Sequence, residues 1–169
     1  HNKISATFDS QYQNWQKYFD KKDPRYVATK KTIENIKCKN LLDVGCGCGA
    51  YLRNIKEDFH DIDLFGVDIS PRLISRCPAF VTAEIGTFYK IPYKSESFDL
   101  VLCHESLEHA IDLNNAIREM SRVVKKGGFV YLIDKDVSKL ARTKLEQWES
   151  WLDYQKCKKA FAECSIVLR

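Results

Sequence analysis

Leu41–Gly49 reads LLDVGCGCG, an apolar run that passes directly into a glycine-rich turn. The leucines and Val44 suit a strand that is covered on both faces. Glycine has no Cβ, so the backbone of the turn can approach a ligand closely. Helical sequence begins at about residue 50. A strand, a glycine turn and a helix in this order are how an open α/β sheet forms a nucleotide site at the carboxyl ends of its strands.

A second expected strand, residues 63–68, ends in an acid. Asp68 lies 19 residues after Gly49, a spacing that suits a carboxylate accepting hydrogen bonds from ribose hydroxyls. The alternative role for Asp68 is a helix N-cap, but Ser70 before Pro71 already suits that role well. We therefore predict that Asp68 binds a ribose.

The spacing of the glycines indicates which nucleotide is bound. A dinucleotide site has the pattern G-x-G-x-x-G, whereas this turn reads G-x-G-x-G and follows Asp43. An acid at that place repels a pyrophosphate and attracts a cation. S-adenosylmethionine offers a ribose, a sulfonium and an ammonium group. The pattern therefore favours S-adenosylmethionine over NAD, and a purely structural glycine turn remains the alternative.

The chain resembles the class I S-adenosylmethionine-dependent methyltransferases, in particular the type 11 methyltransferase domain. Three segments in the family's order carry the resemblance: LLDVGCGCG, FGVDIS and IPYKSESFDLVLCHESLEHAIDLNNAIREMSRVVKKGGFVYLID. They span about residues 38–135. The resemblance implies S-adenosyl-L-methionine as the cofactor, but it does not identify the methyl acceptor.

Strands that alternate with helices predict an α/β fold with a doubly wound, mainly parallel, Rossmann-like sheet. We expect one domain, residues 1–169, with an N-terminal helical cap (1–37), a cofactor-binding core (38–135) and a C-terminal helix and strand (136–169). The expected strands are 41–45, 63–68, 79–83, 98–103, 128–134 and 162–168. The expected helices are 49–57, 71–76, 112–124 and 138–151, with Gly127–Gly128 ending the third. A seventh family strand is not expected, which leaves the C-terminal strand pair incomplete.

The N-terminal cap is expected to contain two helices within residues 9–37. They break near Asp23, which caps the second helix with Pro24 at its first position. The first helix carries an aromatic face: Tyr12, Trp15, Tyr18 and Phe19. This face either packs on the domain or covers the cofactor site as a lid, and both interpretations stay open.

The resemblance assigns cofactor contacts to the ends of the first two strands. Asp43 would anchor the methionine end of the cofactor, directly or through the amides of the turn. Gly45, Cys46 and Gly47 would present their backbone to the cofactor. Ile69 would pack against the adenine, and a core position is the equal alternative for this aliphatic residue.

A third cofactor contact departs from the family pattern. The family commonly reads Gly-Asp-Ala ahead of a Leu-Pro-Phe segment. Aligning Ile91–Tyr93 with that segment puts Thr87 at the position of the acid and Phe88 after it. The Thr87 hydroxyl can accept a hydrogen bond from the adenine amino group, and the Phe88 amide can donate to a ring nitrogen.

The turn after the fourth strand lies beside the transferring methyl group in the family. The carbonyl of Cys103 would lie near the cofactor amine. Methyl transfer is a displacement with a neutral leaving group, so a base is needed only if the nucleophile carries a proton. His104 is our candidate for the catalytic base. We interpret His109 as structural, because L-E-H occurs in family members with different acceptors.

Two other motifs are weaker. The sequence Glu105-x-x-Glu108-His109 resembles a metal half-site of small-RNA 3′-end methyltransferases, but no histidine follows to complete it. We therefore predict no metal. Cys46-x-Cys48 is not the C-x-x-C of redox or metal pairs, and the 7 cysteines are expected to be reduced thiols.

Composition excludes few function classes. The 169 residues carry a net charge of +4, with 44% hydrophobic and 30% charged residues, as in a soluble cytoplasmic protein. No apolar stretch suits a membrane span. We expect methyl transfer to a small-molecule acceptor. A tRNA or small-RNA methyltransferase is the alternative enzyme, although acids interleave with the basic residues of the C-terminal part. A non-catalytic cofactor-binding subunit is the alternative without chemistry.

Overall fold

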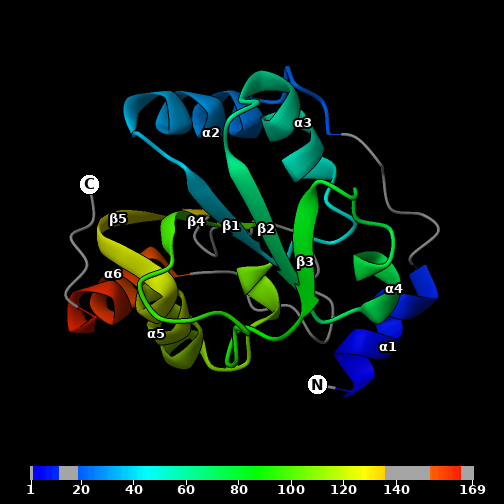
Figure 1. Ribbon diagram of the computed structural model, residues 1–169. Helices are drawn as coiled ribbons and strands as arrows, with labels where there is room; N and C mark the ends of the chain where they lie inside the picture. Colours follow the sequence, from blue (N-terminus) through cyan, green and yellow to red (C-terminus); the bar gives the residue numbers. More distant parts are fainter. Residues whose placement is uncertain (1, 12–18, 136–152, 165–169) are drawn as a thin grey trace.

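The computed structural model describes residues 2–11, 19–135 and 153–164 (Figure 1). Its centre is a sheet of five parallel strands in the order β3-β2-β1-β4-β5. The strands are β1 (Asn40–Val44), β2 (Asp63–Asp68), β3 (Val81–Ile85), β4 (Phe98–His104) and β5 (Val124–Ile133). The strand order reverses between β1 and β4, and a ligand site is expected outside the carboxyl ends of the strands at that point.

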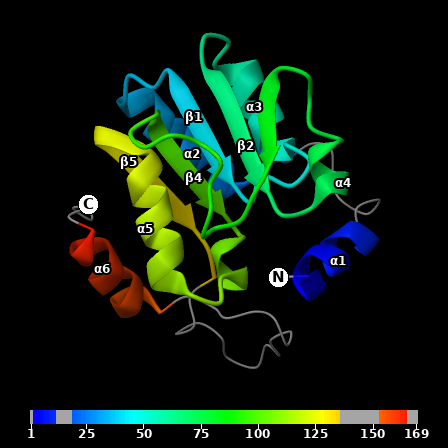
Figure 2. The same ribbon diagram turned by 60° about the horizontal axis from the view of Figure 1, so that its bottom comes forward.

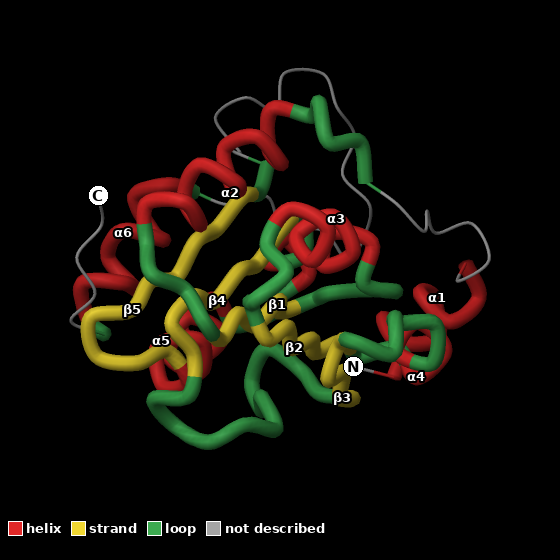
Figure 3. Tube along the Cα trace, turned by 45° about the horizontal axis from the view of Figure 1, so that its top comes forward, coloured by secondary structure: helices red, strands yellow, loops and turns green. Residues whose placement is uncertain are grey.

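Helices cover both faces of the sheet, so the expected doubly wound α/β fold is confirmed. Figure 2 shows α2 and α3 on one face, with α5 and α6 on the other. A short α4 and the N-terminal α1 lie side by side at the end of the sheet (Figure 3). The helices are α1 (Asn2–Gln11), α2 (Pro24–Asn35), α3 (Ala50–Asp58), α4 (Pro71–Ile74), α5 (Leu113–Val123) and α6 (Tyr154–Glu163).

Alternate residues of the central strands enter two separate cores. Leu41 and Leu100 pack with α2 and α3, whereas Leu42 and Val101 pack with α5 and α6. All four side chains are fully buried. This burial on both faces explains why the strands read as continuous apolar runs.

Helix starts follow the predicted caps. The Asp23 side chain accepts a hydrogen bond from the Arg25 amide, with Pro24 at the first position of α2. Ser70 caps α4 by accepting from the Leu73 amide at 3.2 Å. Both predictions are confirmed, and Asp68 is therefore not needed as the cap of α4.

Several element boundaries differ from the prediction. β3 lies two residues later than expected. The first helix begins at Asn2, and Tyr12, Trp15 and Tyr18 lie outside the described residues. Gly127–Gly128 does not end α5, which stops at Val123, but lies inside β5 where the register with β4 shifts. Gly127 has φ +77° and a Cβ on Gly128 would lie 2.8 Å from the Asp99 carbonyl oxygen, so the glycines serve an irregular strand.

The predicted C-terminal strand, 162–168, is wrong where it is described. Residues 162–163 belong to α6, whose start Asp153 caps by accepting from the Gln155 amide at 2.8 Å. Cys157, Ala160 and Phe161 are its buried residues, and their helical spacing places one apolar stripe in the core with α5. The rest of that strand and the predicted helix 138–151 lie outside the described residues.

Candidate active site

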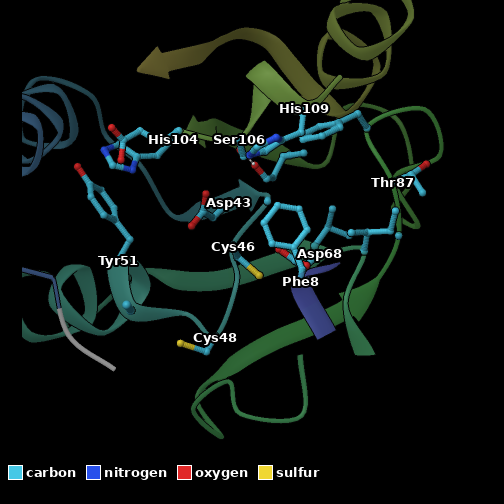
Figure 4. Close-up of a pocket in the computed structure, with 18 of the residues that line it drawn as sticks. Phe8, Asp43, Cys46, Cys48, Tyr51, Asp68, Thr87, His104, Ser106 and His109 are labelled. Carbon is cyan, nitrogen blue, oxygen red and sulfur yellow. Dashed lines mark hydrogen bonds between the residues drawn. The ribbon is translucent and has the colours of Figure 1, made fainter. Parts of the chain in front are cut away.

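A cavity of about 500 Å³ opens at the carboxyl ends of β1, β2 and β4 (Figure 4). Most of the predicted site residues line it: Asp43, Gly45, Cys46, Asp68, Ile69, Thr87, Phe88 and His104. Gly47 and Cys103 are not among the lining residues. The Gly47 amide faces Asp68 instead, and the buried Cys103 thiol lies 3.2 Å from the Ser106 hydroxyl.

The glycine turn is shaped by backbone that only glycine adopts easily. Gly45 has φ +84°, and its amide donates to the Val67 carbonyl at 2.8 Å. A Cβ on Gly45 would lie 2.5 Å from the Cβ of Ser106. The Ser106 hydroxyl in turn donates to the Val44 carbonyl at 3.0 Å. The turn is thus held tightly between β1, β2 and the segment after β4.

Asp68 joins two turns across the cavity wall. One carboxylate oxygen accepts from the Gly47 amide at 2.9 Å, and the other accepts from the Ser70 amide at 2.9 Å. Burial raises the pKa of Asp68, although these amide bonds favour the ionised form. Each carboxylate oxygen can accept a further hydrogen bond. The side chain is therefore fixed in place with acceptor capacity left for a ligand.

The buried Asp43 carboxylate lacks a hydrogen-bond partner at one oxygen among the described residues. Its side chain is 2% exposed, and Oδ1 has no hydrogen-bond partner among the described residues. Burial, and then the charge of Asp68, raise the pKa of Asp43 to about 7. A buried carboxylate without a partner is costly, and a cationic ligand group would remove that cost.

His104 lies at the other end of the cavity, against aromatic rings (Figure 4). Its ring lies 4.4 Å from the Tyr51 ring, at 30°, and 5.3 Å from the Phe19 ring, at 89°. The Tyr51 hydroxyl forms a 2.9 Å hydrogen bond with the Thr29 hydroxyl. His104 Nε2 has no hydrogen-bond partner among the described residues, and burial lowers the pKa of His104. The neutral imidazole can accept a proton.

Comparison with known proteins identifies the family of the chain. A family model described as a methyltransferase domain matches residues 42–132. The chain belongs to the methyltransferase domain family. S-adenosylmethionine is the cofactor of this family.

Two of the curated relatives illustrate the similarity. An uncharacterised protein of Methanocaldococcus jannaschii is 37% identical over 108 residues, which is 63% of this chain and 46% of the relative. Ajmaline N-methyltransferase of Rauvolfia serpentina is 32% identical over 106 residues, which is 57% of this chain and 36% of the relative. The chain spans less than half the length of these relatives.

A solved structure shows the same fold over nearly the whole chain. It comes from a Haloferax volcanii complex that contains the Trm112 methyltransferase activator, and it matches with a TM-score of 0.76 at 20% identity. The match covers 96% of this chain and 77% of that one. Among the described residues, no helix has the length and apolar character to cross a membrane.

The residues of the methyltransferase site fit S-adenosylmethionine. The unpartnered Asp43 oxygen suits the cationic end of the cofactor, and the Asp68 carboxylate suits two ribose hydroxyls. Ile69 and Phe88 supply apolar surface to the cavity. A Cβ at Gly45 would meet Ser106, so this part of the wall is formed by backbone.

Helix α1 contacts the cavity rim next to Asp68, a position that the sequence did not predict for residues 2–11. The Ser5 hydroxyl donates to the Ile69 carbonyl at 3.2 Å, and the Ser70 hydroxyl donates to the Asp9 carboxylate. The Phe8 ring lies 5.2 Å from the His109 ring, at 74°. The helix thus contacts both rims of the cavity. In the sequence, Phe8 stands out only as the one aromatic side chain of residues 1–11 besides His1. Nothing else in that segment indicated a contact with the cavity.

The two acids of the Glu105-x-x-Glu108-His109 motif form ion pairs with different residues. Glu105 has φ +44° and pairs with Arg25, whereas Glu108 pairs with Lys135 at 2.9 Å. Glu108 Oε1 also lies 3.7 Å from His109 Nε2. Within residues 2–11, 19–135 and 153–164, no three His, Cys, Asp or Glu side chains are grouped to hold a metal ion.

Proposed function

We propose that this chain transfers the methyl group of S-adenosylmethionine to a small-molecule acceptor, at oxygen, nitrogen or carbon. The observation that supports a small acceptor is the closure by α1. Phe8 contacts His109 on one rim, and Ser5 and Asp9 bond to residues 69–70 on the other. The remaining cavity of about 500 Å³ is of the size that holds small molecules.

In this proposal, the chain acts mainly by aligning the cofactor with the acceptor. The bound cofactor supplies an activated methyl group on a positively charged sulfur. Asp68 holds the ribose, and Asp43 balances the positive charge of the methionine end. The glycine turn brings backbone against the cofactor without side chains. His104 Nε2, which is free of other hydrogen bonds within the described part of the chain, takes the acceptor's proton where the nucleophile carries one.

The charges around the cavity favour a neutral or cationic acceptor. Asp43, Asp68 and Glu105 line the cavity, and no Lys or Arg does so among the described residues. The Arg25 guanidinium pairs with Glu105 and lies 2.6 Å from the Asp23 carboxylate. Two carboxylates therefore already balance this cation. A carboxylate or phosphate on the acceptor would meet net negative charge.

An acceptor panel with labelled S-adenosylmethionine tests this function. We expect label transfer to small amines or phenols and little transfer to matched carboxylic acids, with no loss of activity when a chelator is added. Total tRNA forms a separate arm at two salt concentrations. Salt-sensitive labelling of tRNA alone would overturn the small-molecule proposal in favour of an RNA acceptor. Cofactor binding without labelling of any acceptor would favour a non-catalytic subunit.

A further inference from the structure

Two cysteines far apart in the sequence meet at the glycine turn. The Cys46 thiol donates to the Gly47 carbonyl oxygen at 3.6 Å, and the Cys77 thiol approaches the same oxygen at 3.4 Å. The interaction between the two side chains also raises the pKa of Cys46 and lowers the pKa of Cys77. The sequence pointed to Cys46 and Cys48 through their C-x-C spacing, but the fold pairs Cys46 with Cys77.

The segment after α4 holds Cys77 against the turn. The Cys77 amide donates to the Ile74 carbonyl at 3.0 Å, which closes a tight turn at the helix end. A Cβ on Gly49 would lie 3.0 Å from Pro78 and 3.5 Å from the Cys77 sulfur. Residues 77–78 therefore pack on the turn in close van der Waals contact.

The two thiols differ in the way that disulfide exchange requires. Cys77 is half-buried, and its interaction with the Cys46 side chain lowers the pKa of Cys77. Cys46 is 7% exposed, and its pKa is raised by the same interaction and by burial. Cys38, another half-buried cysteine, has its pKa raised to about 12 by burial. The more accessible and more acidic thiol thus stands beside a buried partner.

We propose that Cys46 and Cys77 are an oxidative modification site: they form a reversible disulfide on reaction with a low-molecular-weight disulfide such as oxidised glutathione. The Cys77 thiolate attacks one sulfur of oxidised glutathione, forming a mixed disulfide and releasing one glutathione thiolate, which takes up a proton. Cys46 then loses its proton and attacks the Cys77 sulfur, releasing the second glutathione. The two protein thiols are oxidised by two electrons, and oxidised glutathione is reduced to two thiols.

The disulfide would act on the cofactor site through Gly47. Forming the bond brings the two sulfurs to about 2 Å apart and removes both thiol contacts from the Gly47 carbonyl. The amide of the same residue holds Asp68 at 2.9 Å, and Cys46 itself lines the cavity. Moving this peptide displaces the groups that would bind the ribose. Oxidation should therefore weaken cofactor binding.

Peptide mapping of the whole chain tests the bond without any assay of methyl transfer. After treatment with oxidised glutathione, trypsin should release residues 40–53 linked to residues 77–90, and dithiothreitol should separate them. The link should disappear in Cys77→Ser and Cys46→Ser. It should persist in Cys48→Ser and in the matched half-buried control Cys38→Ser. No link, or a link that needs Cys48, would overturn the assignment.

Calorimetry with S-adenosylhomocysteine tests the consequence. The oxidised protein should bind this probe about tenfold more weakly or worse, because small displacements of binding groups are costly. The reduced protein and Cys77→Ser treated with oxidised glutathione should keep their affinity. A mapped disulfide that leaves the affinity unchanged would overturn the link to the cofactor site. A reduced protein that does not bind the probe would instead contradict the proposed function, whatever the mapping shows.

Discussion

The cavity has two ends that are built in different ways. At the strand end, Asp43 lies within β1, Gly45 follows it and Asp68 ends β2, and backbone hydrogen bonds fix the turn and Asp68. At the aromatic end, the rings of Phe19 and His104 both contact the Tyr51 ring. Phe19 precedes β1, Tyr51 lies in α3 and His104 ends β4. Ring contacts hold this second end together, and its polar His104 Nε2 has no partner in the described part of the chain.

This difference separates binding from acceptor chemistry. The strand end presents backbone and carboxylates that match the parts every S-adenosylmethionine molecule has. The aromatic end presents apolar surface and the neutral imidazole of His104, which we propose to face the acceptor. We therefore expect substitutions at the strand end to change cofactor affinity or stability, and substitutions at the aromatic end to change turnover.

The largest expected effect is at the aromatic end. His104→Ala should lower kcat by about 10²–10⁴-fold, the usual effect of losing a general base, with the acceptor found in the panel. The affinity for S-adenosylhomocysteine should hardly change, because Asp43 and Asp68 remain. His60→Ala, at an exposed histidine, is the control. Unchanged turnover in His104→Ala would mean that the chain works by alignment alone or uses another base.

The next effect is on stability at the strand end. Gly45→Ala combines a left-handed backbone with a collision against Ser106, and it should lower the free energy of unfolding by about 2–5 kcal/mol. Gly127→Ala is a matched control, because Gly127 has φ +77° but open space around its Cβ position. It should cost only about 1–2 kcal/mol. Urea unfolding measures both, and equal losses would show that Ser106 does not constrain the turn.

The third effect is on cofactor affinity. Asp68→Ala should weaken binding by about 1.5–3 kcal/mol, the value of charge-assisted hydrogen bonds to a ligand. Because Asp68 also holds the Gly47 and Ser70 amides, the variant should lose some stability as well. Asp63→Ala, at the exposed start of the same strand, is the control. A dissociation constant that equals that of the control would remove Asp68 from the ribose site.

The strand end was predictable because its signals are local. An apolar run, a glycine turn and an acid at fixed spacing already predict β1, β2 and the position of Asp68 at the end of β2. The parallel register that brings Asp43 beside Gly66 follows from the strand order. Asp43 and Asp68 therefore lie on one cavity wall, as the sequence indicated.

The aromatic end was less predictable because its contacts cross long stretches of chain. His104 was singled out, but Tyr51 and Phe19 join it only through the packing of α3 and the segment before α2. The pairing of Cys46 with Cys77 depends in the same way on where α4 ends. The error at residues 162–163, which were predicted as strand, has another cause. Cys157, Ala160 and Phe161 already showed a helical period, but the apolar content near residue 162 obscured it.

The smallest and most specific effect is the pH dependence of the strand end. Asp43, with its pKa raised to about 7 by burial and by Asp68, must lose its proton before it can balance a cation. Affinity for S-adenosylmethionine should therefore fall as pH drops below about 7, by up to tenfold per unit.

The proton on Asp43 also stabilises the fold. Because the folded pKa exceeds the usual 3.8, this contribution is present below about pH 4 and is lost as pH rises to about 7. Asp43→Asn should bind more weakly at neutral pH, with a flatter pH profile of affinity and of melting temperature. Calorimetry and thermal melts between pH 5 and 8 measure both. An unchanged slope in Asp43→Asn would assign the titration to another group and leave the strand end without its cation anchor.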